Sequence, residues 1–152
     1  MRRTVVLPLL SAILLLTLAL PAAALSGGPR LYAVASFAVK PVTIANITGD
    51  GSALLGQMKS RGGAIHWSAW TSSRADGAGK IWIDDCIPDT AGGTFHGRPA
   101  TIHASRVRTG HYTRMTVSFR AGDRMWDEGT TRYVDRYRLQ HLSGRYFTWM
   151  RL

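Results

Sequence analysis

Three aspartates surround the single cysteine of this 152-residue chain. Asp84, Asp85 and Asp89 lie in the segment IWIDDCIPDTAGG, which also contains Cys86 and Pro88. Closely spaced carboxylates could hold calcium through oxygen ligands, but their order does not match an EF-hand loop. Aspartates at the end of a strand more often accept backbone N–H groups in turns. We therefore interpret Asp84, Asp85, Cys86 and Pro88 as a structural turn and predict no metal site.

Catalysis by these carboxylates or by the cysteine has little local support. Asp84 and Asp85 are adjacent, so on a strand they point to opposite faces, whereas the two acids of a glycosidase face each other about 5–9 Å apart across a cleft. Cys86 and His96 could form a nucleophile–base pair, but no neighbouring motif favours it. The five histidines lack zinc spacing, and there is no Gly-x-Ser-x-Gly elbow, phosphate loop or dinucleotide fingerprint. We predict no catalytic residues and no cofactor.

Two tryptophans in the segment HWSAW are candidates for contact with a ligand. Trp67 and Trp70 are three positions apart, and on a strand this odd spacing predicts opposite faces. One ring would then belong to the core, and the other would be partly exposed, where a flat ring can stack on a sugar or on a partner protein. Packing of the second ring across the edge of the sheet is the alternative.

The charge is strongly positive and is concentrated late in the chain. The formal net charge is +10, and eleven arginines but only four acidic residues fall between Arg98 and Leu152. A basic face is therefore expected on this half, with Arg114, Arg136 and Arg138 as candidate binding residues. An anionic wall polymer, a glycan or a protein is the predicted partner, and nucleic acid is not expected. A biased codon composition is the alternative explanation, because only three of the 19 basic residues are lysine.

Short runs of alternating apolar and polar residues, separated by glycine-rich breaks, predict an all-β fold. In the clearest run, Met115, Val117 and Phe119 share one face of a strand. Their spacing along the chain indicates a single antiparallel β-sandwich or barrel-like domain over residues 31–152. Only residues 52–60 could form a short helix, with Ser52 as its cap. The expected strands are residues 37–47, which Pro41 breaks, 65–70, 79–84, 100–107, 113–119, 132–142 and 144–152.

The first 24 residues have the three-part layout of a secretory signal peptide. An Arg-Arg pair precedes an apolar run from Val5 to Leu20, and small residues follow up to Ala24. The run is shorter than the roughly 20 residues of a membrane-spanning helix. We therefore expect cleavage near Ala24, a secreted protein and no permanent membrane span, with residues 25–30 as a loose N-terminus of the mature chain.

One unit of the chain, between residues 46 and 119, combines the paired tryptophans, an Ala-x-Gly-x-Gly run and the turn DDCIPDTAGG. It resembles a group of small exported actinobacterial proteins whose turn reads Asp-Cys-x-Pro-x-Cys-Ala-x-Gly. The resemblance implies a secreted all-β protein without an assigned activity. Thr90 and Thr48 stand where relatives have cysteines, so a crosslink worth about 2–4 kcal/mol would be missing here. We expect Cys86 to be a buried thiol, which could also crosslink two copies.

These features predict a secreted binding or structural module of the bacterial cell envelope or the extracellular space. Recognition would combine an exposed Trp67 or Trp70 with the arginines. A secreted hydrolase acting on wall polymer, using Asp84, Asp85 or Asp89 with a histidine, is one alternative. An exported inhibitor or competition factor is another.

Overall fold

A computed structural model describes residues 28–45, 47–48, 51–89 and 91–152 of the chain. The expected signal peptide, residues 1–24, lies outside these ranges, as do residues 25–27 and Thr90. Within the described ranges, no helix has the length and apolar character to cross a membrane.

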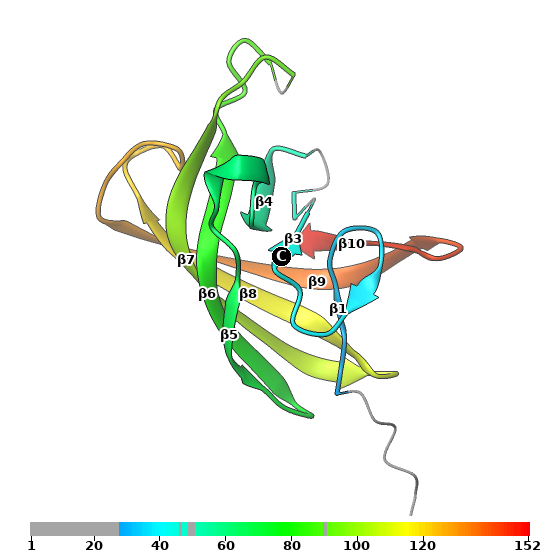
Figure 1. The fold of residues 1–152 in the computed structure, drawn as a ribbon. Coiled ribbons are helices and arrows are strands. Elements are labelled where there is room, and N and C mark those ends of the chain that lie inside the picture. The colour runs from blue at the N-terminus through cyan, green and yellow to red at the C-terminus, as the bar shows by residue number, and fades with distance from the viewer. Residues whose placement is uncertain (1–27, 46, 49–50, 90) are drawn as a thin grey trace, which may run out of the picture.

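The fold is almost entirely antiparallel β-structure, which confirms the predicted class. One sheet has the strand order β10-β9-β8-β7-β6-β4-β3. The strand β5 shares one edge of β6 with β4: β5 pairs with the first half of β6, and β4 pairs with the last residues of β6. The sheet curves into a half-barrel, and the separate β1–β2 hairpin lies on its concave side (Figure 1). The strands are β1 Leu31–Tyr32, β2 Phe37–Ala38, β3 Thr43–Ile44, β4 Ala53–Gly56, β5 His66–Trp70, β6 Arg74–Asp84, β7 Phe95–Arg108, β8 His111–Ala121, β9 Thr131–Ser143 and β10 Tyr146–Arg151.

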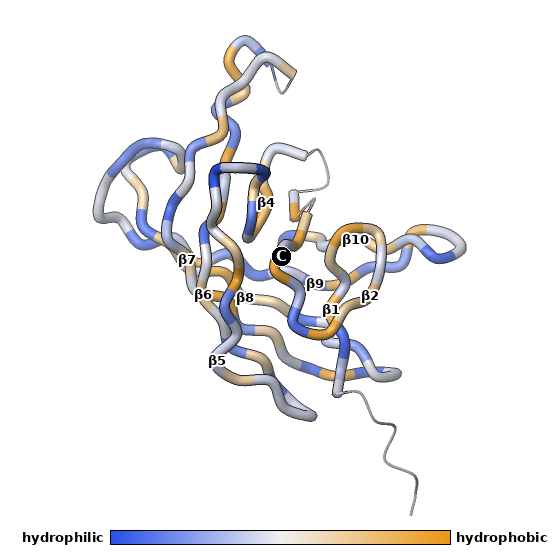
Figure 2. The backbone as a smooth tube through the Cα atoms, viewed as in Figure 1, coloured by the Kyte–Doolittle hydropathy of each residue, from blue (hydrophilic) through white to orange (hydrophobic). Residues whose placement is uncertain are grey.

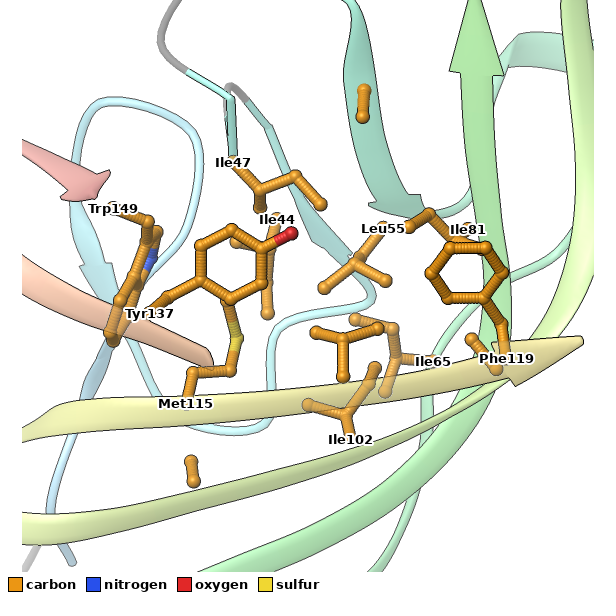
Figure 3. Packing of buried hydrophobic residues seen from close by; sticks show 14 of the residues in the cluster. Ile44, Ile47, Leu55, Ile65, Ile81, Ile102, Met115, Phe119, Tyr137 and Trp149 are labelled. Atoms are coloured by element: carbon orange, nitrogen blue, oxygen red, sulfur yellow. The ribbon is translucent and has the colours of Figure 1, made fainter. Parts of the chain in front are cut away.

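Alternation along the long strands separates a buried face from an exposed one. Met115, Val117 and Phe119 on β8 are at most 3% exposed and pack with Ile102 and Leu55 on the concave side (Figure 3). Polar and apolar stretches follow one another along the same strands (Figure 2). The core thus fills the concave side. The opposite side of β6, β7, β8 and β9, called the outer face below, carries the polar residues.

The helix predicted for residues 52–60 is wrong. Ala53–Gly56 form β4, and only Lys59–Arg61 form a 3-10 helix. Ala53 and Leu55 are buried where β4 pairs with β6, and this burial outweighs the weak helical propensity of a segment that contains glycine. Gly56 has a φ of +98°, a left-handed conformation that a helix interior does not accommodate.

The single strand predicted for residues 37–47 is divided between two sheets. Phe37–Ala38 form β2 of the hairpin, whereas Thr43–Ile44 form β3 at an edge of the main sheet. Pro41 lies between them, and because it has no N–H it interrupts any continuous ladder. The predicted break at this proline is therefore a change of sheet.

Residues just before and within β1 fasten the hairpin to the main sheet. The N–H of Arg30 donates to the carbonyl of Gly110 at 2.9 Å, and its carbonyl accepts the N–H of Tyr112 at 3.0 Å. The indole N–H of Trp149, on β10, donates to the carbonyl of Tyr32 at 3.0 Å. The first described strand is therefore held by strands from the second half of the chain.

A histidine is packed beneath this hairpin. The ring of His111 stacks on Phe37 with a centroid separation of 3.7 Å and an interplanar angle of 16°. Its Nδ1 is buried and has no hydrogen-bond partner among the described residues. Burial lowers the pKa of His111 below its usual value, and the nearby charge of Arg30 lowers it further. The packed hairpin therefore favours the neutral ring.

Acidification is expected to destabilise the protein through His111. Because its pKa is lower in the folded than in the unfolded chain, its contribution to stability is complete above the ordinary value of about 6.5 and is lost as the pH falls below it. In His111→Phe, which keeps a ring against Phe37 but cannot be protonated, the Tm should fall less between about pH 7.5 and pH 5 than in the wild type. Thermal unfolding at a series of pH values measures this, and equal decreases in both proteins would contradict it.

Candidate functional site

Trp67 and Trp70 lie on the same side of the sheet, so the prediction of opposite faces is wrong. A β-bulge between Trp67 and Ala69 shifts the register of β5 against β6, and the three-residue spacing no longer alternates. The two rings meet edge to face with centroids 4.8 Å apart, and Trp70 also meets the buried Tyr112 at 5.3 Å. Both rings are half-buried against the core.

The polar atoms of both tryptophans are already used. The indole N–H of Trp67 donates to the carbonyl of Pro41 at 2.8 Å, and that of Trp70 donates to the carbonyl of Pro29 at 2.9 Å. These bonds join two N-terminal segments to β5. The contacts account for both tryptophans as packing residues, and they separate them from the arginines with which they were expected to act.

The three arginines singled out from the sequence come together on the outer face. Arg114 on β8 is directly opposite Arg138 on β9. Arg136 lies two positions from Arg138 on β9, opposite Thr116, and therefore on the same face. Directly opposite residues have their Cβ atoms only about 4.5–5.5 Å apart. The predicted basic face therefore exists as a defined patch on two neighbouring strands.

A second arginine pair on this face was not predicted. Arg120 on β8 is directly opposite Arg132 on β9, and both are exposed. The sequence did indicate that Arg120 shares a face with Arg114, because the two are an even number of positions apart on one strand. The register that brings Arg132 opposite Arg120 could not be read from the sequence. We call the set of Arg114, Arg120, Arg132, Arg136 and Arg138 the arginine face.

The arginine face has no carboxylate partner within the ranges that the structure describes. The arginine ion pairs found there involve Arg74, Arg98 and Arg151. Among the described residues, the guanidinium of Arg120 donates to the carbonyl of Thr130 at 2.9 Å, and the other four guanidinium groups of the arginine face have no hydrogen-bond partner. Like charges directly opposite on adjacent strands destabilise a sheet. Two such pairs lie on this face, which makes the arginine face the strongest candidate for contact with an anionic ligand.

A shallow groove crosses the outer face where one row of residues is small. Ala78 on β6 is opposite Thr101 on β7, which is opposite Ser118 on β8. Two hollows, of about 480 Å³ and about 380 Å³, share these three residues as their floor. We call the two hollows together the outer groove. Each falls within the range of about 300–1,000 Å³ that is typical of ligand pockets.

The two hollows of the outer groove differ in chemistry. Arg120 and Arg132 border the larger hollow. His66, Asp76 and His103 border the smaller one. A ligand that lies across the floor would meet guanidinium groups at one end and a histidine–aspartate pair at the other.

Backbone N–H groups of their own turn bind all three aspartates around Cys86, although Oδ2 of Asp84 is buried and has no hydrogen-bond partner among the described residues. Asp84 accepts one backbone N–H group, and Asp85 and Asp89 accept two each, at 2.8–3.1 Å. Asp85 also contacts Nε2 of His96 at 3.0 Å. The N–H of Thr94 and, after it, His96 hold the pKa of Asp85 below its usual value. His96 thus pairs with Asp85 and not with Cys86.

Cys86 lies two residues after the end of β6. Its side chain is half-buried and not fully buried as expected. Its sulfur lies 3.7 Å from the carbonyl oxygen of Asp84. Among the described residues, no group of three or more histidine, cysteine or acidic side chains is arranged to hold a metal ion.

A charged cluster on the concave side was not predicted. Asp135 is 4% exposed, and its Oδ1 forms an ion pair with the guanidinium of Arg151 at 2.5 Å. Its Oδ2 accepts a hydrogen bond from the hydroxyl of Tyr137 at 3.3 Å. Burial, with the neighbouring carboxylate, raises the pKa of Tyr137 above its usual value, so the hydroxyl stays protonated and can donate. A cavity of about 200 Å³ lies beside these residues. Because Asp135 is satisfied by both partners, we assign the cluster a structural role.

Comparison with known proteins finds no protein-family model that matches this chain, no similar curated protein and no similar solved structure.

Proposed function

We propose that the protein is a secreted module of the bacterial cell envelope that binds an anionic polymer along the outer groove and the arginine face beside it. The secreted location rests on the layout of residues 1–24. The binding role rests above all on the like-charge pairs Arg114–Arg138 and Arg120–Arg132, which face each other directly on a solvent-exposed sheet. A bound anion would turn these repulsive pairs into favourable contacts.

A polymer with repeated phosphate groups suits this surface better than a neutral glycan does. The guanidinium group is planar, stays charged and pairs with phosphate through two parallel hydrogen bonds. Alternate residues on a strand, such as Arg136 and Arg138, are about 6.8 Å apart along the strand. Two neighbouring strands thus present positive charges at regular intervals, which favours a phosphodiester wall polymer as the ligand. Trp67 and Trp70 have no part in this contact.

Removal of four charges from the arginine face is expected to abolish most of the binding. We predict that Arg114→Gln, Arg120→Gln, Arg132→Gln and Arg138→Gln together reduce retention on immobilised poly(glycerol phosphate). Each phosphate contact contributes about 0.7–0.9 to the slope of log affinity against log salt, so removal of four contacts should lower the slope by up to about 3.5. Affinity measured over a series of salt concentrations gives this slope.

A matched control separates the arginine face from net charge. Arg106, Arg108, Arg124 and Arg145 lie outside the arginine face and are exposed. A variant with these four changed to glutamine has the same net charge as the test variant, and its slope should stay close to that of the wild type. The proposal fails if the wild type is not retained at low salt, or if both variants lose the same affinity.

The hydrolase alternative loses support in its original form. Asp84, Asp85 and Asp89 are engaged by backbone N–H groups of their own turn. No observation favours an exported inhibitor over a polymer-binding module.

A further inference from the structure

The outer groove contains a histidine–aspartate pair that anion binding does not require. His103 on β7 is directly opposite Asp76 on β6, and its Nδ1 lies 2.6 Å from Oδ1 of Asp76. Nε of Arg74 lies 3.4 Å from the other carboxylate oxygen. The carboxylate is thus held by two groups, and it can fix both the orientation and the tautomer of the histidine ring.

The second ring nitrogen of His103 is available to a ligand. Nε2 has no hydrogen-bond partner among the described residues, and the side chain is 49% exposed beside the smaller hollow. With Nδ1 donating its proton to Asp76, Nε2 carries the lone pair of a base. The base therefore stands in the same groove as the proposed polymer site.

Guanidinium groups lie on the same face of the sheet as this base. Arg114 on β8 is opposite Ser105, two positions from His103 on β7, and Arg136 on β9 lies two strands from His103 in the row that runs through Thr116. Hydrolysis of a phosphodiester needs a base to activate water and positive groups to stabilise the charge on the phosphoryl oxygens. The outer face carries both, because alternation places the base and the arginines on one side of the sheet.

We propose that the outer groove hydrolyses phosphodiester bonds, with His103 as the general base and Asp76 as the residue that positions it. The inference rests on the proposed function in that the same groove holds the polymer. His66 lies on β5, directly opposite Ala78 on β6, and it borders the same hollow as His103. In this proposal His66 supplies the acid.

The reaction consumes one water molecule. Nε2 of His103 takes a proton from the water, and the water oxygen forms the new bond to phosphorus. The bond from phosphorus to the leaving oxygen breaks, and that oxygen takes a proton from the protonated form of His66. The products are a phosphomonoester and an alcohol. His103 then releases its proton to solvent, and His66 takes one up.

Formation of phosphomonoester ends from poly(glycerol phosphate), followed by ³¹P NMR, tests the inference. We expect steady formation with the wild type and at least a 100-fold lower rate with His103→Gln, in line with the usual contribution of a general base. His141→Gln is the matched control, because His141 binds the carbonyl of Gly144 in the β9–β10 hairpin, and its rate should not change.

The role of Asp76 is tested by conservative replacement. In Asp76→Asn the rate should fall at least tenfold with little change in Tm, because the ring of His103 loses the carboxylate that orients it. Asp76→Glu keeps a carboxylate and should restore part of the rate. A residue that only supported the fold would lower the Tm together with the rate.

Binding and hydrolysis can fail separately. His103→Gln should lower the affinity for the polymer far less than it lowers the rate, since it removes no arginine. The inference is overturned if the wild type forms no monoester above the buffer blank, or if His103→Gln is as fast as the wild type. In either case, unchanged retention on the polymer would still support the binding function, whereas loss of retention in the wild type would overturn both.

Discussion

Replacement of Trp149 by alanine is expected to lower the free energy of unfolding by about 3–5 kcal/mol. Trp149 is 1% exposed, and it is the largest of the fully buried side chains. Its removal would leave a cavity between β10 and the hairpin and would deprive the carbonyl of Tyr32 of its donor. Domains are commonly stable by only about 5–15 kcal/mol, so this single change would remove a large share of the total.

Two further variants separate the contributions at this position. Trp149→Phe keeps a buried ring but loses the hydrogen bond to Tyr32, so it should cost less than the alanine variant. Met150→Ala changes the next residue, which is 44% exposed, and should alter stability by no more than about 0.5 kcal/mol. Equilibrium unfolding in denaturant gives all three values. A loss below about 1 kcal/mol for Trp149→Ala would mean that the hairpin is not packed as described.

The second large effect is expected at the buried ion pair. Arg151→Met would leave the buried carboxylate of Asp135 with the Tyr137 hydroxyl as its one remaining partner among the described residues. Loss of one partner from a buried pair is strongly destabilising, and we expect a cost of about 2–4 kcal/mol. This cost is lower than the roughly 3–5 kcal/mol of a fully enclosed pair, because 55% of the Arg151 side chain is exposed.

A double variant shows whether the unpaired charge causes the loss. Asp135→Asn combined with Arg151→Met removes both charges, so it should be more stable than Arg151→Met alone. Denaturant unfolding at neutral pH compares the wild type, both single variants and the double variant. If the double variant is as unstable as the sum of the single variants, the two side chains do not interact.

Much of the fold was predictable because alternation is a local signal. The run around Met115, Val117 and Phe119 gave the correct buried face, since it depends only on the two-residue period of a strand. The errors arose where distant pairing decided the outcome. Residues 53–56 became a strand because β6 was available to pair with them, and residues 37–47 were divided because their two halves found different partners.

The candidate site was predictable only in part. Arg114, Arg136 and Arg138 were named from charge alone, but their placement opposite one another depends on the register of β8 with β9. The pair of Asp76 and His103 is 27 positions apart in the chain and joins only through the pairing of β6 with β7. The predicted faces of Trp67 and Trp70 were wrong because a bulge inserts one extra residue between them, so that they share a face. No residue type in HWSAW indicates that bulge.

The first described strand needs contacts from strands late in the chain, and this requirement affects the order of folding. The bond between Trp149 and Tyr32 spans 117 residues, and Arg30 pairs with residues at the start of β8. Sheets built from such distant contacts fold slowly, over milliseconds to seconds, because a long loop must close before the contact forms. Of the described strands, those of the hairpin are synthesised first, yet Tyr32 lacks its contacts with Phe147 and Trp149 until the last strand is made. A truncation of β10 should therefore leave the earliest part of the chain exposed to proteases and to aggregation.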